Sequence, residues 1–192
     1  MSTQTLATTI TIGPVRVSYH NLLKPRSQNG NAEEKKYGAT FLIPKSIPAI
    51  KQSIDSAIEA AIRDGLNTKW NGSAPPQPPI PLSDGDGVRP NGDRYSPECY
   101  SNYVMSAKSK DKPEIVNMQL QPIINESEIY NGMYVYASVS FFSYARSGKK
   151  GIGCSLNAVM KYKDGDPLGR RITAASAFAS ILNQNDWGEK NV

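Results

Sequence analysis

The stretch NGMYVYASVSFFSYARSGKKGIGCSLNAVMKYK, residues 131–163, decides which fold this sequence can form. Over residues 133–144 the side chains alternate with the period of two that is typical of a β-strand. One set is apolar and predicts a buried face: Met133, Val135, Ala137, Val139 and Phe141. The other set combines aromatic rings with serines: Tyr134, Tyr136, Ser138, Ser140, Phe142 and Tyr144. This second face is too polar for a core and too aromatic for an ordinary solvated surface.

A cationic turn with glycines follows this strand. It has the sequence RSGKKG over residues 146–151, and the apolar-rich residues 152–162 are expected to return as a second strand. The spacing of Gly148, Gly151 and Gly153 does not match the G-x-x-x-x-G-K-S/T phosphate loop, so we expect them to serve a turn with positive φ. The segment therefore predicts a long β-hairpin with rings on one face and cations at its tip.

The positive charge of the chain is concentrated around this hairpin. The whole chain has 22 Lys and Arg against 17 Asp and Glu, a net charge of +5. Residues 131–171 hold seven cations against Asp164 and Asp166, which accounts for the whole excess. Cations interleaved with aromatic rings are typical of grooves for single-stranded nucleic acid, where cations neutralise phosphates and rings stack on bases.

These patterns define two groups of candidate nucleic-acid contacts. The first comes from the hairpin: Tyr134, Tyr136, Phe142, Tyr144, Arg146, Lys149, Lys150, Lys161 and Lys163. The second comes from residues 100–109, whose pattern predicts another strand, and from the turn that follows: Tyr100, Tyr103, Lys108 and Lys110. For the second group, a solvated strand edge is an equally good interpretation.

Other segments also have strand patterns. Residues 8–19 alternate weakly, and Gly13-Pro14 suggests a bulge or an edge position within them. Residues 37–44 alternate too, which places Tyr37 with the core residues. We expect residues 114–123 to pair with residues 100–109 as a hairpin.

One helix is predicted with Ser46 as its N-cap and Gly65 at its far end. Its apolar positions recur at helical spacing: Ile50, Ile54, Ala57, Ile58, Ala61 and Ile62. This stripe is broad enough to pack against one side of a small barrel. A second, short helix is predicted over residues 172–182.

Residues 67–97 are expected to form a long excursion of turns, because six prolines lie between positions 75 and 90. Its aspartates do not fit a calcium loop. Starting that loop at Asp84 puts Val88 and Tyr95 at the fifth and twelfth positions, where oxygen ligands are needed. We therefore predict Asp-Gly turns and no metal site.

Several other classes of function are disfavoured. The single histidine, His20, has no recognisable triad partners, and Cys99 and Cys154 lack metal-ligand spacing. Both cysteines are expected to be reduced thiols. The sequence has no secretory leader and no apolar run long enough to cross a bilayer. We expect a soluble, non-exported protein with no catalytic residues and no cofactor.

Two blocks carry a family resemblance: YGATFLIPK at residues 37–45, followed by the isoleucine-rich helix, and residues 132–171. With the end that contains Phe178, they resemble the single-stranded DNA-binding proteins of tailed bacteriophages, similar to the replisome protein of short-tailed coliphages. The resemblance implies a mainly β OB-fold, a five-stranded Greek-key barrel with one capping helix. A single domain would span residues 1–182, with a long Pro/Gly-rich insertion and a short C-terminal helix.

The resemblance also implies a function. It implies a non-enzymatic protein that binds single-stranded DNA with little sequence preference during phage replication or recombination, in the cytoplasm of the infected bacterium. It supports these contacts: Tyr134, Tyr136, Phe142, Tyr144, Arg146, Lys149 and Lys150. Partners would be single-stranded DNA, phage or host replication proteins and, in a homodimer, a second copy.

The end of the sequence departs from this family. Its members usually end in a strongly acidic tail, whereas residues 183–192 have a net charge of −1. Either such a tail has been removed or this member recruits its partners differently.

Two alternatives remain open. The aromatic face would serve as a subunit interface if this were a phage structural or assembly protein. An enzyme acting on nucleic acid is the third reading, which the scattered carboxylates disfavour.

Overall fold

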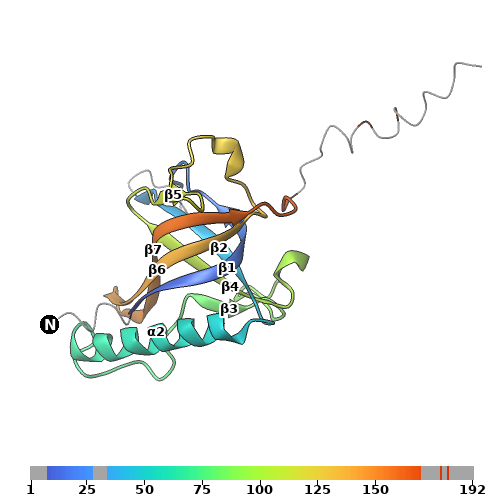
Figure 1. Cartoon of the computed structure of the whole chain (residues 1–192). Coiled ribbons are helices and arrows are strands. Elements are labelled where there is room, and N and C mark those ends of the chain that lie inside the picture. Colours follow the sequence, from blue (N-terminus) through green and yellow to red (C-terminus); the bar gives the residue numbers. More distant parts are fainter. Residues whose placement is uncertain (1–7, 28–33, 170–177, 179–180, 182–192) are drawn as a thin grey trace, which may run out of the picture.

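Five strands close into a ring in the computed structural model, which describes residues 8–27, 34–169, 178 and 181 (Figure 1). They are β1 (Thr9–His20), β2 (Tyr37–Pro44), β4 (Asn102–Ser109), β6 (Tyr134–Arg146) and β7 (Lys149–Lys163). Their order around the ring is β4-β2-β1-β6-β7, and neighbours are antiparallel up to that point. The ring closes where β4 meets β7 in parallel through the pair Lys108 and Ser155.

The alternation predicted for residues 133–144 is confirmed. The apolar set points into the ring and is almost fully buried: Met133, Val135, Ala137, Val139 and Phe141. The other set points outward and is half-buried or exposed. Burying a large apolar side chain stabilises a fold by about 1.5–3 kcal/mol, which fixes the face that β6 turns inward.

Helix α2 (Pro48–Asn67) runs along one side of the ring (Figure 1). Its predicted apolar stripe is confirmed, because Ile50, Ile54 and Ile58 are buried in the shared core. The predicted N-cap was wrong: Ile47 holds that position without a side-chain capping bond, and Pro48 opens the helix. Proline suits that turn because the N–H it lacks has no partner inside the helix.

The predicted hairpin of residues 100–109 with residues 114–123 was wrong. Strand β5 (Glu114–Val116) pairs in parallel with the outer edge of β7 instead. The reason is that β2 takes one edge of β4, while β3 (Leu82–Asp84) and β7 take the other. The free edge of β7 is left for β5.

A bulge in β1, the long connection after α2 and an ion pair complete the fold. The register of β1 and β6 shifts between Ile12 and Val15, which confirms the bulge at Gly13-Pro14. Residues 68–96 consist of turns, bends and irregular backbone apart from β3, and two 3-10 turns lie at Pro97–Cys99 and Glu126–Glu128. The Asp84 and Asp86 carboxylates both pair with Lys45 Nζ, at 2.6 and 2.7 Å.

Three further sequence predictions concern the cysteines, the end of the chain and membrane-spanning segments. Cys99 and Cys154 are both buried and free. The short helix expected over residues 172–182 lies almost entirely outside the described residues. Within the described ranges, no helix combines the length and the apolar composition needed to cross a membrane.

Candidate nucleic-acid interface

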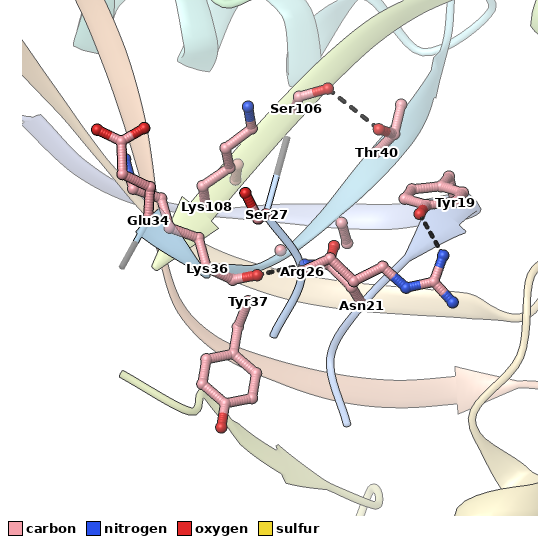
Figure 2. A pocket seen from close by; sticks show the side chains of 13 residues that line it. Tyr19, Asn21, Arg26, Ser27, Glu34, Lys36, Tyr37, Thr40, Ser106 and Lys108 are labelled. Atoms are coloured by element: carbon pink, nitrogen blue, oxygen red, sulfur yellow. Dashed lines mark hydrogen bonds between the residues drawn. The ribbon is translucent and has the colours of Figure 1, made fainter. Parts of the chain in front are cut away.

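Two adjoining hollows mark the outer surface of the ring. The first, about 450 Å³, lies over the end of β1, over β2 and over β4 (Figure 2). The second, about 540 Å³, lies over β4, β6 and β7. Both are lined by Lys36, Ser106 and Lys108, so they form one continuous depression, which we call the groove. The groove runs across the strands and passes over the point where β4 and β7 close the ring.

The charge of the groove is positive. Its lining contains Arg26, Lys36, Lys108 and Lys110 against a single carboxylate, Glu34. Burial lowers the pKa of Lys108, and repulsion by the Lys36 ammonium lowers it further. An anion placed between these two side chains, such as a phosphate group, would favour the charged form of Lys108 and so raise its pKa again.

The first hollow is held in shape by the segment that follows β1. Backbone bonds of 2.9 and 3.0 Å join Arg26 and Lys36 in both directions, and Arg26 Nη1 donates to Tyr19 Oη at 2.8 Å (Figure 2). On the adjoining strands, the hydroxyls of Thr40 and Ser106 share a hydrogen bond of 3.0 Å. The aromatic ring of Tyr19, cationic side chains and hydroxyl groups therefore line one open surface.

The second hollow presents two aromatic rings on glycine supports. The Phe142 ring lies over Gly153, where an added Cβ would be 2.4 Å from Cζ, and Tyr144 lies over Gly151, where Cβ would be 2.5 Å from Oη. These two glycines were expected in a turn but make room for the rings instead. Of the three, only Gly148 (φ 76°) belongs to the turn, next to Ser147 (φ 51°), as in a two-residue type I′ hairpin.

The groove contains part of the predicted set. The predicted residues that line it are Lys108, Lys110, Phe142 and Tyr144. Arg146 lies at the exposed hairpin tip, 3.8 Å from the Glu34 carboxylate, and Lys149 is exposed at the same tip.

Lys150, predicted as a DNA contact, bonds to the protein backbone in this structure. Its ammonium donates to the carbonyl oxygens of Trp70 at 3.2 Å and Ser73 at 2.8 Å. This side chain ties the hairpin to the segment after α2, because two of its three donors are taken by backbone oxygens.

Four predicted residues lie toward the other end of the hairpin, outside the groove. The Lys161 side chain is only 12% exposed and pairs with Asp164 at 2.8 Å. Lys163 lies over the Tyr134 ring, 5.0 Å from its centroid, and Tyr136 meets Tyr162 edge to face at 5.5 Å. Each of these four side chains therefore has a partner within the protein.

Tyr100 and Tyr103 also lie apart from the groove. Tyr100 follows the 3-10 turn Pro97–Cys99, and Tyr103 is near the start of β4. The Tyr103 ring has the ammonium groups of Lys45 and Lys51 within 5.1 and 5.3 Å of its centroid. Among all the described residues, no group of three His, Cys, Asp or Glu side chains is placed to hold a metal ion.

Comparison with known proteins assigns the chain to a family. The sequence model described as "Enterobacter phage Enc34, ssDNA-binding protein" matches residues 8–188. The chain belongs to the Enc34 family. Among its relatives, protein p50 of Acyrthosiphon pisum secondary endosymbiont phage 1 is 30% identical over 163 residues, which cover 82% of this chain and 84% of p50.

Solved structures agree with the Enc34 assignment. The single-stranded DNA-binding protein of bacteriophage Enc34, in complex with single-stranded DNA, is 32% identical with a TM-score of 0.71, covering 84% of this chain and 90% of that one. The single-stranded DNA-binding protein gp2.5 of bacteriophage T7 is 14% identical with a TM-score of 0.58, covering 95% and 98%. The latter likeness concerns the fold alone: a mainly β ring of five strands akin to the OB-fold, with one α-helix in the described part.

The sequence predictions for this Enc34 relative missed three groove residues: Tyr19, Arg26 and Lys36. A signal was available, since OB-folds use the connection between their first two strands in ligand binding, and here that connection is rich in cations. Tyr37, expected in the core, is half-buried at the groove, and its ring points away from the other labelled side chains (Figure 2).

Proposed function

We propose that this member of the Enc34 family is a non-enzymatic protein that binds single-stranded DNA in the groove. The fold is assigned as an OB-fold with β1, β2, β4, β6 and β7 as its five strands, α2 as the capping helix and residues 67–97 as an insertion. The main support is the place of the groove: it covers the second and third of these strands and reaches the connection between the first two, the face that OB-folds use for oligonucleotides.

The chemistry of the lining suits a single strand of any sequence. Arg26, Lys36, Lys108 and Lys110 are placed to neutralise phosphates, and this contribution does not depend on the bases. Phe142 and Tyr144 offer rings on which bases stack, and every base has a face that stacks. Unpaired bases are accessible to such rings, whereas the bases of a duplex are stacked on one another.

The likeness to the Enc34 protein supports the same class of ligand. That protein was crystallised with single-stranded DNA and is 32% identical to this chain. We infer that the protein coats single strands during phage DNA replication or recombination in the infected cell, where replication proteins would be its neighbours.

A titration with a fluorescently labelled single-stranded oligonucleotide, beside the same sequence as a duplex, tests this function. We expect a strong preference for the single strand. The logarithm of the affinity should fall with the logarithm of the salt concentration, with a slope of up to about −2.8 for four phosphate contacts. Equal affinity for the duplex, or no binding, would contradict the proposal and favour the phage assembly protein.

A further inference from the structure

The C-terminal end of α2 lies against the part of β6 that carries the two groove rings. Gly65 allows the close approach, since a Cβ there would be 2.7 Å from Ser143 Cβ and 3.0 Å from the Trp70 ring. Trp70 itself is 1% exposed and packs in the core. The helix end and this part of the hairpin therefore pack as one unit.

Polar contacts fix the same junction. Lys69 Nζ donates to the Ser143 carbonyl and Trp70 Nε1 to the Tyr144 carbonyl, each at 2.9 Å. The register of β1 against β6 reaches only to Ser140 within the described residues. The backbone that carries the Phe142 and Tyr144 rings pairs with β7 along one edge. Beyond Ser140, two side chains from the turn that follows α2 add hydrogen bonds to its carbonyl groups.

Lys69 also brings a cation to Phe142. Its ammonium is 6.0 Å from the centroid of the Phe142 ring, and the residue is exposed. A lysine has three donors, and the Ser143 carbonyl takes one of them. Lys69 lines neither hollow, so its positive charge lies outside the groove.

We propose that the DNA interface extends past β6 onto the end of α2 and the turn that follows it, where Lys69 and Trp70 lie. Lys69 binds a phosphate next to the nucleotide whose base stacks on Phe142, and Trp70 is a positioning residue that fixes the backbone carrying Phe142 and Tyr144. This inference rests on the proposed function. It predicts a longer path for the strand than the two hollows provide.

The Lys69 contact is tested with Lys69→Gln in salt-dependent titrations of labelled single-stranded oligonucleotide. Losing one phosphate contact should reduce the salt slope by about 0.7 and weaken binding about fivefold at 0.1 M salt. Lys69→Arg should keep the slope. The matched control is Lys51→Gln, a lysine in the first turn of α2, at the far end of the helix from Lys69, which should change neither quantity.

Trp70→Phe tests the positioning role, because it keeps an aromatic ring in the core while removing the donor to the Tyr144 carbonyl. Affinity should fall by between about twofold and tenfold, the range that one hydrogen bond supports, with an unchanged salt slope. In a Phe142→Ala, Tyr144→Ala background the same substitution should have no effect on affinity. A purely structural role would lower the thermal midpoint and leave affinity equal in both backgrounds.

The outcomes separate this inference from the function it rests on. If Lys69→Gln behaves like Lys51→Gln while Phe142→Ala and Lys108→Gln weaken binding, the groove stands and the extension onto α2 is wrong. If Trp70→Phe does not fold, the Lys69 pair still decides the extension. If none of these variants weakens binding to the oligonucleotide, the groove itself is the wrong site.

Discussion

Replacing Phe142 by alanine separates the contribution of a ring to binding from its contribution to stability. The side chain is 43% exposed, so a little over half of it is removed from water by its contacts. Truncation should therefore cost about 1 kcal/mol of unfolding free energy, roughly half the value for a fully buried large apolar side chain. For a chain of this size the thermal midpoint would fall by about 2–4 °C.

The effect of Phe142→Ala on binding should be larger. Stacking of one base on an aromatic side chain is worth about 1–3 kcal/mol, which corresponds to a Kd that is about five to 150 times higher. The salt slope should stay unchanged, because no cation is removed. Fluorescence anisotropy with a labelled single-stranded oligonucleotide at two salt concentrations measures both quantities, and a thermal melt measures the stability.

Tyr162→Ala is the matched control. Tyr162 is on the same hairpin and is 42% exposed, but its ring packs edge to face on Tyr136, outside the groove. This variant should bind the oligonucleotide within about twofold of the parent, since it loses no stacked base. Equal losses of affinity in the two variants, or a folded Phe142→Ala protein with unchanged affinity, would refute the assignment of the groove.

Three other predictions concern single side chains. Because burial and Lys36 lower the pKa of Lys108 in the free protein, and a bound phosphate would raise it, affinity should fall as pH rises through the lowered pKa; a Lys108→Gln variant should lack this part of a pH series. Lys150→Gln should lower the thermal midpoint but leave the salt slope unchanged, because its ammonium is bonded to backbone carbonyls; a reduced slope would show that it contacts phosphate. Burial raises the pKa of Cys154 to about 12, so its thiol should stay protonated at pH 8 and react with a chromogenic disulfide reagent only once the chain is unfolded; fast reaction in the native protein would contradict this.

The period of two in residues 133–144 was enough to predict which side chains face the core, because burial depends on a local alternation. It was not enough to predict where the groove would lie. Tyr134 and Tyr144 point outward from the same strand, yet the groove reaches only Tyr144. The groove crosses the strands and combines residues far apart in the sequence, such as Tyr19, Lys108 and Phe142, so no local pattern describes it.

Long-range contacts also decide features that a sequence pattern does not describe. Lys150 has the sequence neighbours of a phosphate ligand, but its partners are carbonyl oxygens of Trp70 and Ser73. Backbone oxygens leave no trace in an amino-acid pattern. Likewise, β5 follows β4 after a short turn, as the second strand of a hairpin would, but the edges of β4 are occupied and β5 pairs with β7.

The parallel closure between β4 and β7 has a consequence for local opening. The ladder there consists of the single pair Lys108 and Ser155, in contrast to the long ladder between β6 and β7. Amide protons beside this pair should exchange with deuterium sooner than those of the other strands. A DNA strand lying across this pair would contact both β4 and β7. It would slow that exchange, because a ligand that binds only the closed form stabilises it. DNA binding would then be measured as protection of amide protons in β4 and β7. The bound strand would bridge the point where the ring is closed by the shortest ladder.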